Sequence, residues 1–191
     1  MNKIIGILGM QGAITEHQEI LIQIPHTKTC IVKTAKDLDC IDGLILPGGE
    51  STAIGKLLDY FSLKEILQQK IISGLPVFGT CAGLILLAKN IENQTNTHLA
   101  TMDITVKRNG YGSQLDSFST NLLIPTIDKN MPIPLVFIRA PYITKTDKDV
   151  QILATLDNKI IAARQKNMLV TAFHPELTND LRFHQYFLSM I

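Results

Sequence analysis

The chain lacks several features that mark particular classes of protein. Its 191 residues include no tryptophan, only three cysteines, and no apolar run near the ~20 residues that a membrane-spanning helix needs. The net charge is +1 without a basic block, which argues against nucleic acid or an anionic membrane as the main partner. The cysteines have no paired spacing and the first residues show no signal-peptide layout, so we expect a cytoplasmic protein.

Cofactor and metal motifs are also missing from the sequence. It contains neither HExxH nor CxxC, and no carboxylate cluster has the spacing of metal ligands. The phosphate-binding patterns GxGxxG and GxxxxGK[ST] are absent too. We therefore expect no metal and no cofactor.

What is present indicates a globular α/β protein. Apolar residues make up 46% of the chain and charged residues 18%, enough to bury a substantial core. The first half alternates apolar strand-like runs with helical periodicity, which predicts a mostly parallel sheet with helices on both faces. The expected strands are 3–9, 29–33, 42–46 and 75–80, and the expected helices are 13–24, 51–58 and 63–73.

The second half has a different pattern. Short strands are expected at 102–108, 117–124, 135–138, 150–156, 159–164 and 168–173, followed by a helix at 178–190. Asp157-Asn158 between two apolar runs favours a hairpin. No linker or repeat divides the chain. We predict a single domain over residues 1–191, with a three-layer α/β architecture and an antiparallel extension of the central sheet.

The most informative segment is Gly79-Thr80-Cys81-Ala82-Gly83, between an apolar strand and an apolar helix. Glycines on both sides of a cysteine allow a sharp turn that exposes the thiol at the sheet edge, where the helix N-terminus favours the thiolate. A buried, inert cysteine is the alternative, because free cysteines usually have that role. We expect that role for Cys30 and Cys40, which lie in apolar segments.

A thiol nucleophile needs a base, and His174 is the best placed of five histidines. It ends the apolar run 168–173, and Pro175 stiffens the following turn. Glu176, two residues on, is positioned to fix the imidazole tautomer. The other histidines have weaker contexts: we expect His17 to be solvated in a polar helix, His26 and His98 to lie in loops, and His184 to lie on the last helix.

Two glycine turns are candidates for stabilising an oxyanion. Pro47-Gly48-Gly49-Glu50-Ser51 ends one strand and opens a helix, so its amide groups can face a ligand. The turn 9–12, which contains Gln11, follows the first strand at the same predicted edge. Each turn alone is also compatible with a plain βα loop.

Together these motifs resemble the class I, or triad, glutamine amidotransferases, and within them the glutaminase subunits of pyridoxal 5′-phosphate synthases. The resemblance spans nearly the whole chain. It is carried by the segments 9–13, 46–52, 78–84, 108–109, 116–118, 137–141 and 173–178. Two places depart from the family pattern: residues 109–114 read Asn-Gly-Tyr-Gly-Ser-Gln instead of Asn-Ser-Phe-Gly-Arg-Gln, and Tyr142 replaces a histidine.

The resemblance implies a role for each matching residue. Cys81 is expected to be the nucleophile, His174 the general base and acid, and Glu176 the residue that orients His174. Gly48, Gly49 and Gln11 are the candidates for the oxyanion loop. The glutamine-binding residues implied by the resemblance are Gly49, Glu50, Ser51, Arg108, Ile138 and Arg139.

The resemblance further implies an activity and a partner. The chain is expected to hydrolyse L-glutamine through a Cys81 thioester and to deliver ammonia to a (βα)₈-barrel synthase subunit that makes pyridoxal 5′-phosphate, in a hetero-oligomer. The alternatives are the glutaminase of another pathway, a γ-glutamyl hydrolase that acts alone, and a regulatory relative without catalysis. On spacing alone, Arg108 and Arg139 are equally compatible with carboxylate binding and with structural salt bridges.

Overall fold

The computed structural model describes residues 2–110 and 117–191. In these ranges the strands are β1 (Lys3–Leu8), β2 (Thr27–Val32), β3 (Gly43–Leu46), β4 (Val77–Thr80), β5 (Ala88–Ile91), β6 (Met102–Lys107), β7 (Ser117–Leu122), β8 (Ile133–Ile138), β9 (Tyr142–Thr146), β10 (Gln151–Leu156), β11 (Lys159–Gln165) and β12 (Met168–Thr171). The α-helices are α1 (Ile14–Leu21), α2 (Ser51–Tyr60), α3 (Lys64–Ile72), α4 (Ala82–Leu87) and α5 (Arg182–Leu188), and the 3₁₀ helices are η1 (Ala35–Asp39) and η2 (Pro175–Leu177).

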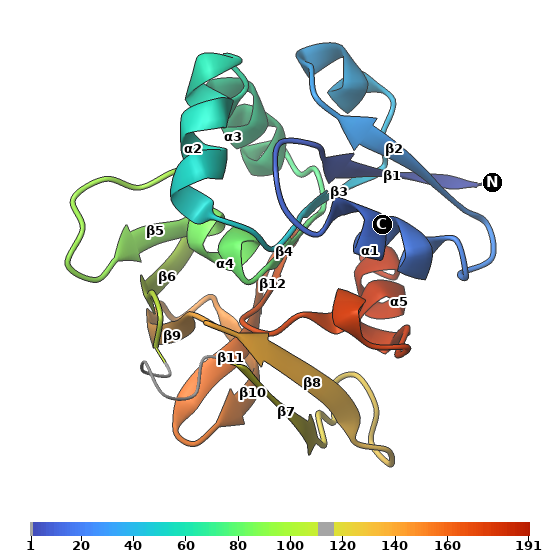
Figure 1. Ribbon diagram of the computed structural model, residues 1–191, viewed down its shortest axis with the longest axis vertical. Coiled ribbons are helices and arrows are strands. Elements are labelled where there is room, and N and C mark those ends of the chain that lie inside the picture. The colour runs from blue at the N-terminus through green and yellow to red at the C-terminus, as the bar shows by residue number, and fades with distance from the viewer. Residues whose placement is uncertain (1, 111–116) are drawn as a thin grey trace.

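Among the described residues, ten strands form one sheet in the order β2-β1-β3-β4-β12-β11-β9-β6-β5, with β10 paired to β11. The first five strands of this order are parallel to one another. Beyond β12 the sheet continues through antiparallel pairs, as far as the parallel pair of β6 and β5. This arrangement confirms the predicted fold class: a largely parallel core with an antiparallel extension (Figure 1).

The parallel strands are covered on both faces, which explains why β3, β4 and β12 are fully buried apolar runs. Helices α1 and α5 lie together on one face, and α2 and α3 lie on the other (Figure 1). Successive residues of β4 point to opposite faces: the Phe78 ring packs edge-on against His184 of α5, whereas Gly79 lies against Gly83 of α4.

The β7–β8 hairpin forms a separate two-stranded sheet. A row of aromatic rings joins it to the core: Phe118 stacks on Phe137 at 4.5 Å between ring centroids, and Phe137 meets Phe173 edge-on at 5.7 Å. Phe173 in turn contacts Phe183 of α5 at 5.1 Å. The hairpin is thereby held beside the end of β12, where His174 follows.

Several details differ from the sequence expectations. Strands β5 and β9 were not predicted, and α5 is shorter than the expected helix 178–190. Cys40 follows η1 and is exposed, so the prediction that it fills the core is wrong, while Cys30 is half-buried against the core. The departures at 111–114 and the family motif residue Asp116 lie outside the described residues.

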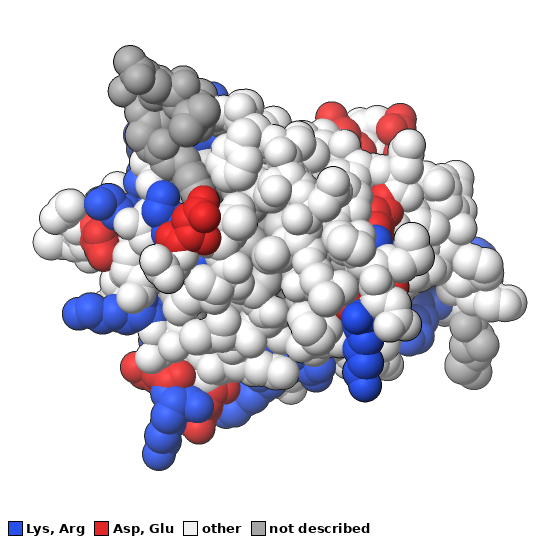
Figure 2. Space-filling view, turned by 90° about the horizontal axis from the view of Figure 1, so that it is seen from below, with Lys and Arg blue, Asp and Glu red and all other residues white. Residues whose placement is uncertain are grey.

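The surface gives two further observations. Figure 2 shows the molecule from below, where charged side chains gather mainly around the margin of a largely uncharged face. Of the helices in the described ranges, none has both the length and the apolar character needed to cross a membrane.

Phe78 offers a direct test of the packing between β4 and α5. Its side chain is fully buried, so Phe78→Ala is expected to lower the free energy of unfolding by about 3–5 kcal/mol through lost contacts and a cavity. Phe61→Ala is the matched control, because that ring is 51% exposed and its loss is expected to change stability by no more than about 0.5 kcal/mol. Urea unfolding of the two variants measures this, and equal losses would contradict the described packing.

Candidate active site

The loops that follow β1, β3, β4 and β12 meet at one edge of the sheet, as the carboxyl ends of parallel strands do. Loops after β6 and β8 close the other side of a cleft of about 520 Å³. The cleft is lined by Gln11, Gly12, Ala13, Glu16, Gly48, Gly49, Glu50, Ser51, Cys81, Ala82, Ile85, Arg108, Asn109, Ile138, Arg139, Pro141, His174 and Leu177.

Cys81 lies at the apex of the turn between β4 and α4, with its backbone at φ +48° and ψ −97°. This conformation is unfavourable for a non-glycine residue, and the Cys81 N–H bond to the Thr171 carbonyl, at 2.8 Å, helps to hold it. The helix also has to approach the sheet closely: a Cβ on Gly83 would lie 2.1 Å from the Leu46 carbonyl oxygen. The glycine of the elbow is therefore required by packing, as the sequence predicts.

His174 follows β12 and faces Cys81 across the cleft floor. Its backbone N–H donates to the Val136 carbonyl of β8 at 2.8 Å, and Pro175 starts the short helix η2 directly after it. The Nδ1 atom of the ring lies 2.7 Å from Oε1 of Glu176. The His174 ring and Cys81 both lie against Gly48, and the two side chains interact electrostatically, so the thiol, the imidazole and the carboxylate are neighbours in one row.

The electrostatics of this row favour an ion pair. Burial lowers the pKa of His174, but hydrogen bonds from its ring to Cys81 and Glu176 and their negative charges outweigh that effect and raise the pKa from 6.5 to about 10. Burial raises the pKa of Glu176, but the nearby rings of His17 and His174 lower it by more, so the net shift of this pKa is downward. The geometry therefore stabilises a charged imidazole next to an ionised carboxylate.

The glycine loop after β3 is held from three sides. The Gly48 N–H donates to Thr80 Oγ1 at 3.0 Å, and the Gly48 carbonyl accepts from the Ala13 N–H at 2.9 Å. The Gln11 side-chain oxygen accepts from the Glu50 N–H at 2.7 Å. The Gly48 amide is thus engaged inside the protein, whereas no described residue accepts a hydrogen bond from the Gly49 N–H.

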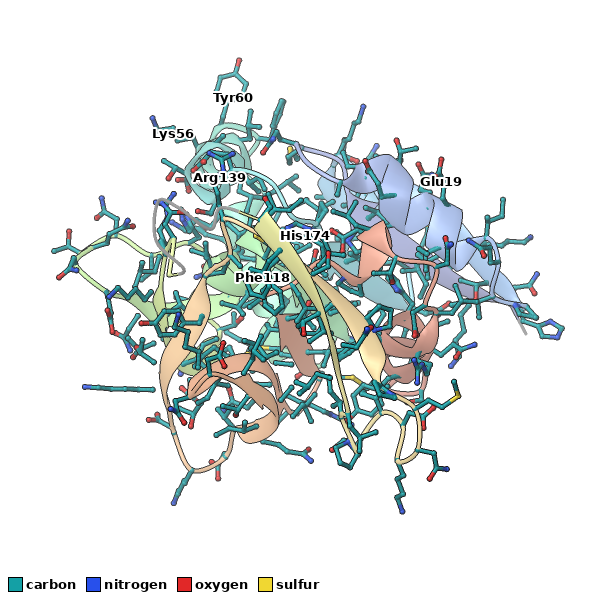
Figure 3. All side chains as sticks on the ribbon, turned by 60° about the horizontal axis from the view of Figure 1, so that its bottom comes forward. Glu19, Lys56, Tyr60, Phe118, Arg139 and His174 are labelled. Carbon is teal, nitrogen blue, oxygen red and sulfur yellow. The ribbon has the colours of Figure 1, made fainter. Side chains whose placement is uncertain are left out.

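The two predicted arginines differ in their surroundings. Arg108 is half-buried and donates to Glu50 at 2.9 Å and to Thr52 at 3.2 Å. Arg139 is exposed at the same edge as His174 (Figure 3), and no described carboxylate lies within ion-pair distance of it. Arg139 is therefore the arginine whose charge is free to meet an anionic group.

The structure brings nearly every predicted site residue to this cleft. Gln11, the glycine loop, Cys81, both arginines, Ile138 and His174 all line it, and Ser51 presents a buried hydroxyl without a partner among the described residues. Glu176 lies behind His174 and does not line the cleft, as expected for a residue that orients the imidazole. The Tyr142 ring packs closely against Gly110, beside the cleft residue Asn109.

Three polar residues behind the row were not predicted to belong to it. His17 is fully buried rather than solvated, so that prediction is wrong, and His184 and Thr80 are fully buried as well. The signal was present: His17 stands three residues after Ile14 and four before Leu21, on the apolar face of its helix. Over the described residues, no group of three or more potential ligands is arranged to hold a metal ion.

The chain is similar to known proteins over nearly its whole length. A protein of Ruminiclostridium cellulolyticum named pyridoxal 5′-phosphate synthase subunit PdxT is 53% identical over 189 residues, covering 99% of this chain and all of the relative. A protein of the same name from Clostridium botulinum is 54% identical to this chain over 185 residues, covering 97% of this chain and 95% of the relative. The crystal structure of a glutamine amidotransferase matches with a TM-score of 0.90 at 37% identity, covering 97% of each chain.

A more distant structure, PurLQS from Thermotoga maritima, shares the fold alone, with a TM-score of 0.72 at 15% identity over 99% of each chain. The fold and its match to the solved glutamine amidotransferase define a class I glutamine amidotransferase. Residues 7–191 match the SNO glutamine amidotransferase family, and the chain belongs to that family. The predicted resemblance and the predicted enzyme class are both confirmed.

The raised pKa of His174 has a consequence for stability. Because the folded-state pKa of about 10 exceeds the ordinary 6.5, the protonated ring contributes stability that is fully present below pH 6.5 and is lost as the pH rises through about 10. The stability of the wild type relative to His174→Gln is therefore expected to be larger near pH 6 than near pH 10. Urea unfolding at both pH values measures it, and a difference that is constant or grows with pH would contradict the ion pair.

Proposed function

We propose that this chain is the glutaminase subunit of a pyridoxal 5′-phosphate synthase. It hydrolyses L-glutamine to L-glutamate and supplies the ammonia to a synthase subunit. The observation that carries this proposal is Cys81 on a strained turn in a cleft, beside the hydrogen-bonded pair of His174 and Glu176, within a chain of the SNO family. The names of these two relatives support the pathway.

In the proposed reaction, the Cys81 thiolate attacks the side-chain amide carbon of glutamine to form a tetrahedral intermediate. As this intermediate collapses, the C–N bond breaks and the His174 imidazolium gives its proton to the nitrogen, which leaves as ammonia. The product is a glutamyl thioester on Cys81. Water then attacks the thioester while the now neutral His174 takes a proton from it, and glutamate leaves as the thiolate is restored.

The negative charge on the amide oxygen needs hydrogen-bond donors in the cleft. The Gly49 N–H and the N–H of Ala82, the residue after the nucleophile, are the candidates, because the Gly48 N–H is already engaged by Thr80. Gln11 supports the loop by bonding the Glu50 N–H. One oxyanion donor typically contributes about 100- to 1,000-fold in rate, so the position of Gly49 controls activity.

Recognition of glutamine is assigned to groups around the rim. Arg139 meets the α-carboxylate, because its charge is free, and the Ser51 hydroxyl and Ile138 backbone contact the rest of the substrate. Arg108 holds Glu50 by an ion pair, which leaves the Glu50 carboxylate positioned for the α-amino group. Every step uses side chains and backbone amides, so the proposal requires no cofactor.

Ammonia released into neutral water is largely protonated and is then not a nucleophile. A glutaminase of this type is therefore useful when docked on a synthase that receives the ammonia directly. The proposed partner is a (βα)₈-barrel subunit that assembles pyridoxal 5′-phosphate, in a hetero-oligomer with this chain. The proposed location is the cytoplasm, which the free thiols of Cys30, Cys40 and Cys81 support because they fit a reducing compartment.

The nucleophile is tested by replacing cysteines one at a time. Cys81→Ala is expected to abolish glutamate release from glutamine in the presence of the synthase subunit, because no thioester can form. Cys40→Ala is the matched control, since Cys40 is exposed and outside the cleft, and it is expected to keep the wild-type rate. Unchanged activity of Cys81→Ala would overturn the mechanism. A wild-type rate that the synthase does not stimulate would overturn the pathway instead.

Arg139 gives a separate test of substrate binding. Arg139→Gln removes the proposed partner of the α-carboxylate and is expected to raise KM for glutamine about 10-fold or more, with a smaller effect on kcat. Lys148→Gln, which removes an exposed charge outside the cleft, is the control. Steady-state kinetics of glutamate release separates the two parameters, and an unchanged KM for Arg139→Gln would contradict the assignment.

A further inference from the structure

Two buried imidazoles have no part in the mechanism described above. His17 of α1 and His184 of α5 are both fully buried, and neither lines the cleft. Buried histidines are costly unless their polar atoms are paired, so their partners are informative. His17 lies 3.7 Å from Oε1 of Glu176, the carboxylate oxygen that contacts His174, and His184 adjoins His17.

The contacts form a continuous row. The Nδ1 atom of His17 lies 2.9 Å from Nε2 of His184. On the other side of the ring, Nε2 of His17 lies 3.2 Å from Thr80 Oγ1 and 3.7 Å from Oε1 of Glu176. That same carboxylate oxygen accepts from Nδ1 of His174 at 2.7 Å. Two elements distant in the sequence, α1 and α5, thus contact the carboxylate through one row of side chains.

The direction of the hydrogen bonds follows from the atoms at the two ends of the row. Nδ1 of His184 has no partner among the described residues, and a bare lone pair there costs less than a buried N–H without an acceptor. The proton of His184 therefore lies on Nε2 and is donated to His17 Nδ1. His17 then carries its own proton on Nε2, facing the Glu176 carboxylate rather than presenting a lone pair to it.

Thr80 connects this row to the glycine loop. Its hydroxyl lies 3.5 Å from Oε1 of Glu176, as a donor, and accepts from the Gly48 N–H at 3.0 Å. A hydroxyl has one proton and two lone pairs, so donation toward Glu176 leaves both lone pairs for Gly48 and His17. With Nε2 of His17 protonated, Thr80 accepts from His17 and Gly48 and donates to Glu176, so the row runs from His184 to the carboxylate.

We propose that His17 and His184 are positioning residues of the glutaminase site: they form a one-way donor chain that holds Oε1 of Glu176 against His174 and fixes Thr80 beneath the glycine loop. This inference rests on the proposed function. The donor chain places two neutral donors behind a buried negative charge, which stabilises the carboxylate without neutralising it. Thr80 thereby connects the triad to the oxyanion loop, because its hydroxyl contacts both Glu176 and the Gly48 N–H.

The charges around His17 agree with a neutral ring. Burial lowers its pKa, Glu176 and Glu16 raise it, and His174 lowers it, with burial the largest effect. Burial and the neighbouring His17 lower the pKa of His184 from 6.5 to about 3. Both rings therefore stay uncharged at neutral pH, where the donor chain is needed.

An NMR experiment can observe the tautomers of His17 and His184 directly. In the full chain labelled with ¹⁵N-histidine, long-range ¹H–¹⁵N correlations distinguish a ring protonated on Nε2 from one protonated on Nδ1. We expect His17 and His184 to be neutral and protonated on Nε2 around neutral pH, with assignments made from His17→Asn and His184→Phe. A proton on Nδ1 of His17, or a charged His17 ring, would overturn the proposal.

Kinetics with two amide replacements separates positioning from simple packing. The His17→Gln side chain can place an N–H near the former Nε2, toward Thr80 and Glu176, whereas His17→Asn can replace only the Nδ1 side. We expect His17→Asn to lower kcat for glutamate release about 10-fold or more while KM changes little, and His17→Gln to restore most of the rate. His26→Asn, at an exposed loop histidine, is the control.

Thermal unfolding of the same variants completes the test. If kcat falls only in parallel with stability, with no difference between His17→Gln and His17→Asn at matched stability, His17 has a packing role and the inference fails. The proposed function fails separately, through full activity of Cys81→Ala. An inactive Cys81→Ala together with a fully active His17→Asn would therefore reject the donor chain and leave the glutaminase assignment in place.

Discussion

The buried carboxylate of Glu176 is the constraint around which the site is organised. A charge that is almost completely removed from water has to be matched by donors from the protein. His174 supplies one at 2.7 Å, and His17 and Thr80 face the same oxygen from behind. Because these groups come from the turn after β12, from α1 and from β4, the contacts with this one charge also fix how helix, sheet and catalytic turn are placed relative to one another.

The sheet meets the second requirement of the site, because it brings the catalytic segments together at one edge. Cys81, the glycine loop and His174 are far apart in the sequence but follow adjacent parallel strands, β4, β3 and β12. The close contact between Gly83 and Leu46 allows α4 to lie directly behind Cys81, and the aromatic row from Phe118 to Phe183 holds β8 against the turn at His174. The stability of the fold and the geometry of the cleft therefore depend on the same contacts.

Much of this was predictable from local patterns, and the remainder was not for identifiable reasons. The alternation of apolar runs predicts the parallel core, and the Cys81 elbow and the His174–Glu176 spacing predict which strand ends carry the chemistry. Strand β5 was missed because its apolar residues continue those of α4, and β9 has no turn signal of its own. The polar neighbours of His17 along the chain predict an exposed side chain, whereas its helical spacing places it on the buried face of α1. Arg108 pairs with Glu50, which is distant in the sequence, whereas Arg139 has no ion-pair partner among the described residues; no local pattern encodes that difference.

The proposed chemistry depends on a covalent intermediate, and that intermediate is the most direct thing to measure. The chain, mixed with its synthase partner and glutamine, is quenched with acid during turnover and analysed by peptide mass spectrometry. A glutamyl group attached to the peptide containing Cys81 is the predicted result. Its absence during active turnover, or its presence on Cys30 or Cys40 instead, would contradict the mechanism.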